Sequence, residues 1–276
     1  MKIKTSKGDR TFQVINILIF AIFAIICAYP FYYLIINSIS ANDLSASGKV
    51  NFLPHGFQLE NYVKVFQLNG LGTAAMVSLG RTVIGTICTV LASVYLGFMF
   101  TQQRMWHRKL WYRFMVITMY FNAGLIPMYM TMKTLHLTNS FWVYIIPAIV
   151  QPFNIIMAKT YVESIPPALQ EAAEIDGATH MQTLFKVKIP MVMPSITICI
   201  FLTLSNSFKL FDQNLSLTAG EPSKMSEMMA LNIFNTFYGR TGWEGVGQAK
   251  AVLFFVLVVA ISMIQLHMTR SKEVQQ

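Results

Sequence analysis

The chain has 276 residues, of which 54% are hydrophobic and only 12% are charged, and its mean hydropathy is +0.50. Soluble domains carry about twice that charged share, so these values exclude an ordinary soluble domain and indicate an integral membrane protein. The formal net charge of +9 does not indicate nucleic-acid binding, because the basic residues flank apolar blocks and form no polar stripe interleaved with aromatics.

Six apolar blocks approach the length of about 20 residues that a membrane-crossing helix needs. In chain order they are residues 13–37, 74–100, 111–133, 140–160, 189–208 and 249–269. The first block follows several lysines, as in a signal peptide, but it is longer than a signal h-region and no small-residue cleavage site closes it. We therefore expect a retained first helix and an all-α membrane protein with six transmembrane helices.

The basic residues predict the orientation. Most of the 21 Lys and Arg residues fall on the side that holds both termini and the short 101–113 loop, so the positive-inside rule places that side in the cytoplasm. The expected parts are a cytoplasmic N-terminal tail (1–12), a transmembrane domain (13–270) containing a cytoplasmic loop (163–188), and a cytoplasmic C-terminal tail (271–276).

The 163–188 loop is the most acidic segment of the chain and contains residues that are typical of helix starts and ends. Ser164 can cap a helix whose first turn holds Pro166 and Pro167. Gly177 can end that helix in the left-handed conformation, and Thr179 with a glutamine three residues later forms a capping-box pattern. We expect two short helices joined at Gly177. An interfacial amphipathic helix with solvated charges would fit the same pattern.

The same segment carries a family resemblance. The matching positions are Glu171-Ala172-Ala173, Asp176-Gly177-Ala178, Phe185, Ile189-Pro190 and Pro194. This string resembles the EAA loop of bacterial ABC importer permeases, in the form found in the carbohydrate-uptake, maltose-permease-like branch. The segments 29–38, 54–62 and 246–255 resemble the same family, whereas Pro167 and Gln170 depart from its common residues.

The resemblance implies a type I ABC importer permease fold in the bacterial cytoplasmic membrane. It further implies a second homologous permease subunit, two ATPase subunits and an extracellular or periplasmic solute-binding protein as partners. The implied ATPase-docking residues are Glu171, Ala172, Ala173, Asp176, Gly177 and Ala178, with Glu171 meeting a basic residue of the ATPase. ATP and Mg would be bound by the partner ATPase, and no cofactor by this chain.

No catalytic or metal site is expected. The sequence has no G-x-x-x-x-G-K-[ST] phosphate loop. Its histidines are scattered over loops and span ends, and its cysteines, Cys27, Cys88 and Cys199, lie inside apolar blocks as small hydrophobic residues. We therefore expect a transport subunit without its own ATPase activity.

Polar residues inside the spans are candidates for the solute path, because such residues usually face a cavity or a neighbouring helix. The candidates are Asn37, Tyr120, Asn122, Gln151, Asn154 and Asn206. Amide and aromatic side chains suit a sugar, but helix–helix hydrogen bonding explains each of them equally simply. Arg81 is expected to extend to the lipid headgroups. In the maltose-type family the solute site can lie entirely in the other permease.

The outer loop 215–227 contains Gly220, Glu221 and Pro222 and is expected to form a protruding turn. The family resemblance implies contact of this turn with the binding protein, and a simple exposed turn is the alternative. A permease for another solute would keep the EAA loop. A secondary transporter or membrane enzyme would need inverted repeats or an ionisable pair within the spans, and the sequence shows neither.

Overall fold

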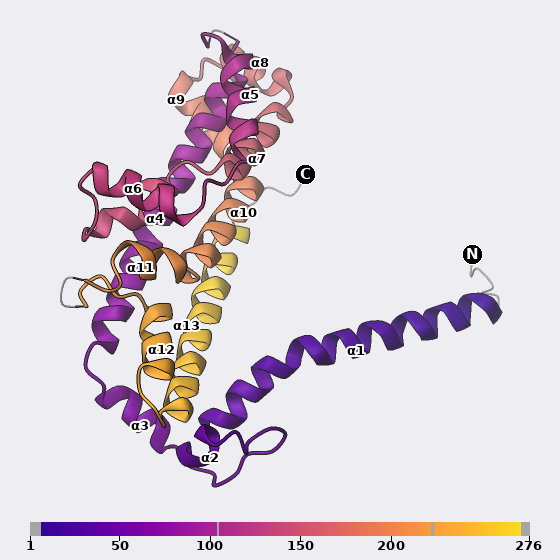
Figure 1. The fold of residues 1–276 in the computed structure, drawn as a ribbon. Helices are drawn as coiled ribbons and strands as arrows, with labels where there is room; N and C mark the ends of the chain where they lie inside the picture. The colour runs from indigo at the N-terminus through magenta and orange to yellow at the C-terminus, as the bar shows by residue number, and fades with distance from the viewer. Residues whose placement is uncertain (1–6, 104, 222–223, 272–276) are drawn as a thin grey trace. The chain divides into compact units, whose positions relative to one another are not determined.

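The computed structural model describes residues 7–103, 105–221 and 224–271, and the regular elements among them are helices (Figure 1). The chain divides into two compact units. The first unit contains Met1–Leu68 and Ile233–Phe254, and the second contains Asn69–Asn232 and Phe255–Gln276.

The first unit begins with the long helix α1, Lys7–Ser38, followed by α2, Asn42–Ala46, and α3, Glu60–Gln67. It also contains the end of α12, Met229–Tyr238, and the first part of α13, Glu244–Arg270. The apolar side chains of α1 are exposed along most of its length. A helix that is apolar on all sides needs an apolar surrounding, so α1 fits a lipid bilayer.

Buried amides hold the segment after α1 in place. Asn61 Nδ2 donates to the carbonyls of Ser38 at 3.0 Å and Ser40 at 2.8 Å. Asn42 Oδ1 accepts from the backbone N–H of Gly245 at 3.0 Å, which ties the start of α13 to the start of α2. The expected outer loop after the first span is therefore a folded, hydrogen-bonded segment.

The second unit is built around α4, Leu71–Thr101, which packs against α7, Pro152–Glu163, and α10, Ile189–Phe208. The approach of α4 to α7 is close at Gly97, because a Cβ placed there would lie 2.8 Å from Ala158 Cβ. Such small residues let membrane helices pack backbone to backbone. The other elements are α5 Arg108–Thr118, α6 Leu125–Thr134, η1 Phe141–Tyr144, η2 Ile146–Ala148, α8 Pro167–Ile175, α9 His180–Thr183, the π-helical turn η3 Leu184–Lys188 and α11 Asp212–Leu217.

Within the described residues, four helical stretches are long and apolar enough to cross a membrane: Arg10–Ser38, Leu71–Thr101, Lys186–Phe208 and Glu244–Arg270. A fifth crossing is possible if Phe141–Ala148 and Pro152–Glu163, which meet at a 45° bend, form one span. The sequence predicted six, and four of those six are confirmed as continuous helices.

The predicted third span, 111–133, is not a continuous helix. It is divided into α5 and α6 by residues 119–124. Asn122 Oδ1 accepts from the backbone N–H of Gly124 at 2.9 Å, and Gly124 has a φ of +83°. A side-chain bond of this kind competes with helical hydrogen bonding, and the positive φ of Gly124, just before α6, lies outside the helical region, so one helix cannot continue through these residues.

The predicted fourth span, 140–160, is also interrupted. It contains two short 3₁₀ segments, η1 and η2, before α7 begins at Pro152. Pro147 and Pro152 lack the N–H that an α-helix interior requires, which explains why the bend lies here.

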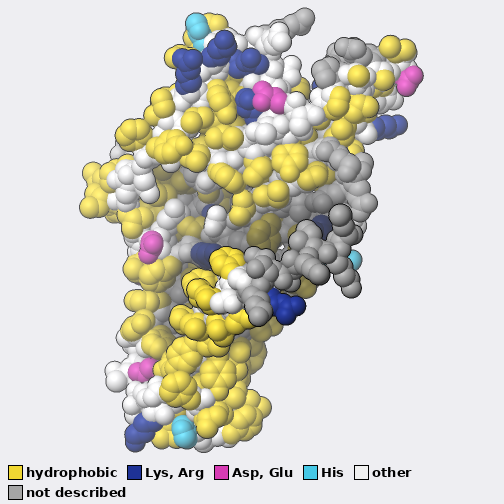
Figure 2. Space-filling view, turned by 90° about the vertical axis from the view of Figure 1, so that its right-hand side faces the viewer, with side chains coloured by type: hydrophobic (Ala, Val, Ile, Leu, Met, Phe, Trp, Pro, Cys, Tyr) yellow, Lys and Arg dark blue, Asp and Glu magenta, His cyan; other side chains and the backbone are white. Residues whose placement is uncertain are grey.

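Large hydrophobic side chains remain on the surface of the membrane helices. Leu91 on α4, Val256 on α13 and Ile264 on α13 are examples. Figure 2 shows hydrophobic side chains over much of the visible face, with one group of Lys and Arg side chains near its upper end and others further down. Extensive exposed apolar surface of this kind fits a lipid surrounding.

Candidate functional site

The turn between α8 and α9 has the geometry that the sequence predicts. Gly177 has a φ of +75°, and a Cβ placed on it would meet nothing within 4 Å. The N–H of Ala178 bonds to the carbonyl of Ala173 at 2.9 Å, which is the six-to-one bond of a Schellman helix end. The prediction that Gly177 ends the first short helix in a left-handed conformation is confirmed.

The capping box at the start of the second short helix is also confirmed. The N–H of Gln182 bonds to Thr179 Oγ1 at 3.3 Å, and the N–H of Thr179 bonds to Gln182 Oε1 at 2.8 Å. The predicted cap at Ser164 is wrong. This serine follows α7, and its hydroxyl donates to the carbonyl of Tyr161 at 2.8 Å, because the helix of α7 extends to Glu163 and takes Ser164 as its own end.

The first short helix, α8, is exposed. Ile175 is 85% exposed, and Leu169 and Ala172 are exposed as well, whereas Ala173 is half-buried. Asp176, at the end of the helix, is exposed, and Ala178 is half-buried. The backbone of Glu171 lies in α8, but its side chain is outside what the structure describes. Exposed apolar side chains beside polar ones are typical of a surface that another protein covers.

The α7–α8 connection lies beside the carboxyl end of α4. Phe98, Thr101 and Gln102 of α4 line a small cavity together with Val162, Ile165, Pro166 and Lys188. The ammonium of Lys188 stands 5.4 Å from the centre of the Phe98 ring. In Figure 1, α8 and α9 lie at the end of the second unit where α4 passes into α5. The 101–113 and 163–188 segments therefore share one end of the helix bundle.

A polar cavity of about 370 Å³ lies among α4, α7 and α10. It brings together three of the predicted solute-path residues, Gln151, Asn154 and Asn206. Asn154 is buried, and its Nδ2 donates to Thr203 Oγ1 at 3.0 Å. The remaining lining residues are Arg81, Ala148, Phe153, Leu202 and Thr203. The volume falls in the range of ligand pockets, about 300–1,000 Å³, and the lining offers amides, a hydroxyl and an aromatic ring.

The prediction that Arg81 extends to the lipid headgroups is wrong. It is 4% exposed, and its Nε donates to the carbonyl of Tyr144 at 3.3 Å. The guanidinium lies against Gly85, one turn further along α4, where a Cβ would be 3.8 Å from Arg81 Cζ. Burial of this side chain could not be deduced from its position in an apolar block, because a long cationic side chain can point either outward or into a cavity.

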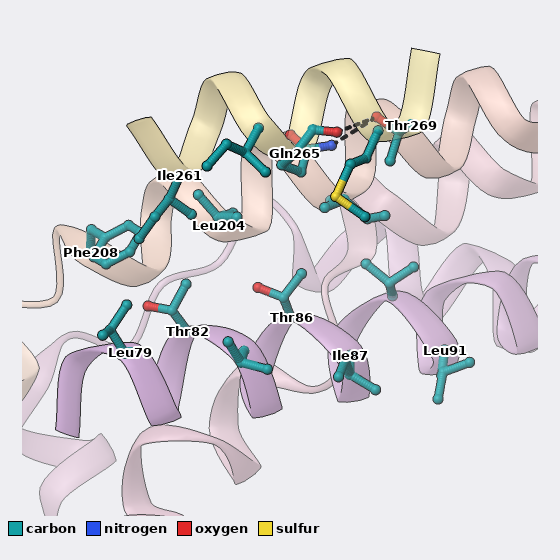
Figure 3. A pocket seen from close by; sticks show the side chains of 15 residues that line it. Leu79, Thr82, Thr86, Ile87, Leu91, Leu204, Phe208, Ile261, Gln265 and Thr269 are labelled. Atoms are coloured by element: carbon teal, nitrogen blue, oxygen red, sulfur yellow. Dashed lines mark hydrogen bonds between the residues drawn. The ribbon is translucent and has the colours of Figure 1, made fainter. Parts of the chain in front are cut away.

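A larger cavity of about 720 Å³ lies among α4, α10 and the end of α13. Figure 3 shows Thr82 and Thr86 on α4 and Gln265 on α13, among apolar side chains such as Leu204 and Ile261. Gln265 Nε2 donates to Thr269 Oγ1 at 3.1 Å. Most of this lining is aliphatic and without a charged group, so the smaller cavity is the better match to a sugar.

Three predicted solute-path residues lie elsewhere. Asn37, in the first unit, is buried and donates to the carbonyls of Tyr33 at 2.9 Å and Val50 at 3.2 Å. Tyr120 is 77% exposed, and Asn122 forms the turn between α5 and α6. None of the three lines the polar cavity.

The loop after α11 is held by a buried polar network. Asn214 Nδ2 donates to Tyr144 Oη at 2.6 Å and to the carbonyl of Ser226 at 2.9 Å. Gly220 is buried with a φ of +90°, and Glu221 is exposed. Pro222 lies outside the described residues. Gly220 therefore shapes this turn, and Glu221 presents a side chain at its surface.

Comparison with known families gives the class of protein. Residues 89–273 match the family described as "Binding-protein-dependent transport system inner membrane component". The chain belongs to this family. The expected role of a transport subunit without its own ATPase is thereby confirmed, and the protein is an inner membrane component.

Relatives and a solved structure agree with this membership. The chain is 45% identical over 141 residues to the probable starch degradation products transport system permease protein AmyD of Thermoanaerobacterium thermosulfurigenes, an alignment that covers 50% of this chain and 48% of that protein. The chain thus spans about half the length of this relative. It is 31% identical over 194 residues to the polygalacturonan/rhamnogalacturonan transport system permease protein YtcP of Bacillus subtilis (strain 168), covering 70% of this chain and 68% of that protein.

The fold is similar to that of a chain in the crystal structure of a bacterial ABC transporter involved in the import of the acidic polysaccharide alginate. The TM-score is 0.83 at 24% identity, and the match covers 95% of this chain and 98% of that chain. The all-helical permease architecture is therefore shared with a solved ABC transporter.

Proposed function

We propose that this family member is one of two homologous permease subunits of a bacterial ABC importer for a sugar or an oligosaccharide. The names of the two relatives, one for starch degradation products and one for polygalacturonan and rhamnogalacturonan, support a saccharide as the solute. The chain forms half of the translocation path. A binding protein outside the cytoplasm delivers the solute, and two ATPase subunits supply ATP hydrolysis with ATP and Mg bound on them.

In this proposal the chain has the six crossings of a type I importer permease, in the bacterial cytoplasmic membrane with both termini in the cytoplasm. The interrupted segments α5–α6 and η1–α7 are the third and fourth crossings. Breaks inside a crossing are tolerated where the freed backbone groups find partners in the protein or face a water-filled cavity.

The observation that carries the proposal is the exposed helix α8 with its glycine-defined end at Gly177. Exposed Leu169, Ala172 and Ile175 offer an apolar surface to an ATPase. Glu171 pairs with a basic residue of that ATPase. Because α9, η3 and α10 follow without interruption, a displacement of the docked loop is transmitted directly to α10.

The solute passes the polar cavity lined by Gln151, Asn154 and Asn206. These residues stand near the start of α7 and the end of α10, which are the outer ends of both helices in the proposed orientation. Glu221, on the turn shaped by Gly220, contacts the binding protein together with Pro222. Amide groups and the Phe153 ring are suited to the hydroxyl edges and apolar faces of a sugar.

The substitution Glu171→Lys tests the docking role. We expect the ATPase to be lost from the purified complex and saccharide uptake to fall to background, since breaking a partly desolvated ion pair costs about 3–5 kcal/mol. The matched control is Glu60→Lys, which removes only the exposed Glu60–Lys64 pair of 2.8 Å and should change neither property. Retention of the ATPase and of uptake in Glu171→Lys would contradict the assignment.

A further inference from the structure

Arg81 is a buried charge in the membrane-spanning part of the second unit. It lies on α4, ten residues after the first residue of that helix, which is about 15 Å along the helix axis. Its exposed fraction is 4%. A cation in this setting is expensive, so membrane proteins keep one where it pairs with an anion or a backbone carbonyl, or where it serves the transported solute.

The protein supplies few hydrogen-bond or ion-pair partners for the Arg81 guanidinium. The Arg81 side chain donates a hydrogen bond from Nε to the carbonyl of Tyr144 at 3.3 Å. A guanidinium has five N–H donors, so one carbonyl leaves most of them available. Among the residues that the structure describes, no carboxylate is paired with Arg81.

The sequence shows why such a carboxylate is missing. Between Glu60 and Glu163 the chain contains no Asp or Glu, and α10 contains none either. The three helices around the polar cavity therefore present Arg81 without an acidic side chain among the lining residues. Among its described lining residues the cavity therefore has one cation and no anion.

The residues that line the cavity beside Arg81 have amide and aromatic side chains, which suit a saccharide. Gln151 and Asn206 are exposed, Asn154 is held by Thr203, and Phe153 adds an aromatic ring. A guanidinium binds a carboxylate through two parallel N–H···O bonds, with more geometric specificity than an ammonium provides. The amides and the ring can contact the hydroxyl groups and the ring face of the same sugar residue.

We propose that Arg81 recognises a carboxylate on the transported saccharide, so that the solute is an acidic, uronate-containing oligosaccharide. This inference rests on the proposed function as a saccharide permease. It goes beyond that function by assigning a charge to the solute and a recognising residue to the polar cavity. A purely structural Arg81 would instead hold the Tyr144 carbonyl at the η1–η2 break and would not distinguish acidic from neutral solutes.

The test compares uptake in cells that carry the native chain, no chain, Arg81→Gln or Arg81→Lys. The probes are radiolabelled galacturonate and mannuronate trisaccharides, the same trisaccharides with their carboxylates methyl-esterified, and maltotriose. We expect chain-dependent uptake of a uronate trisaccharide in preference to its ester. Arg81→Gln should lower uronate uptake about tenfold or more, because it removes a charge-assisted hydrogen bond. Arg81→Lys should lower uronate uptake less.

Assembly of the complex, measured by co-purification of the ATPase, should be unchanged in both variants. Gly72→Ala, at a position on α4 where a Cβ would meet nothing within 4 Å, serves as the matched control and should transport as the native chain does. An equal fall in uptake of acidic and esterified probes in Arg81→Gln would make the residue structural and overturn the inference. Chain-dependent uptake of maltotriose without uptake of uronates would overturn the inference and leave the saccharide permease standing. Uptake of every probe independent of the chain would overturn both.

Discussion

Tyr144 and Asn214 form a buried polar contact in the second unit, close to the candidate site. Tyr144 Oη lies 2.6 Å from Asn214 Nδ2, 2.5 Å from Thr218 Oγ1 and 3.1 Å from the Ser226 carbonyl. The carbonyl of the same Tyr144 accepts from Arg81 Nε. One residue therefore joins the loop after α11 to α4, the helix that contains Arg81.

The substitution Tyr144→Phe should destabilise the protein by about 1–3 kcal/mol, because it leaves buried polar groups without their shared partner. The measurement is the thermal unfolding midpoint of the purified, detergent-solubilised complex, which we expect to fall. Tyr238→Phe is the control, since Tyr238 is 71% exposed and lies at the end of α12, outside the six predicted crossings. Equal midpoints for the native chain and Tyr144→Phe would mean that the network contributes nothing to stability.

At the scale of elements, the proposed coupling to an ATPase would depend on the angle between α8 and α9. The six-to-one bond at Gly177 fixes this angle on one side, and the Thr179–Gln182 capping box fixes it on the other. From His180 onward the chain stays helical to Phe208. A change at Gly177 should therefore affect coupling more than assembly.

We expect Gly177→Val to assemble with its ATPase yet lose coupling. A β-branched residue at a φ of +75° costs roughly 1–2 kcal/mol or re-aims the following helix. The decisive measurement is ATPase activity stimulated by loaded binding protein in reconstituted vesicles, which should disappear. Gly177→Asn is the matched control, because Asn tolerates the left-handed region. Normal stimulation in Gly177→Val would show that the glycine has no role in coupling.

The sequence predicted these elements unequally well. Capping residues and the glycine act locally, so the Gly177 end and the Thr179 capping box followed from their neighbours in sequence. The crossings at α1, α4, α10 and α13 followed from apolar length alone. The break at 119–124 did not, because apolar composition does not distinguish a continuous helix from two short ones. Likewise the cavity around Arg81 depends on the packing of α4 against α7 and α10, which no single segment encodes.

At the scale of the whole molecule, the contacts of the second unit indicate which way the interrupted segments run. Phe100 and Met115, at the end of α4 and in α5, share a buried cluster. Met132 in α6 and Tyr144 in η1 pack instead with Leu217 of α11. Because α4 leads into α5 at one end and α10 leads into α11 at the other, these contacts support the proposed crossing between residues 115 and 132.

This path predicts that Asn139, between α6 and η1, lies on the outer side with the α11 loop. In a background without the three native cysteines, Asn139→Cys and Met225→Cys should react with a membrane-impermeant maleimide in intact cells. His107→Cys, within the basic 101–113 loop, should react only after permeabilisation. All three positions are exposed in the structure, so lack of reaction reports the membrane barrier and not burial. Four crossings would leave Asn139→Cys on the cytoplasmic side, and labelling of that variant only in permeabilised cells would contradict the six-crossing arrangement.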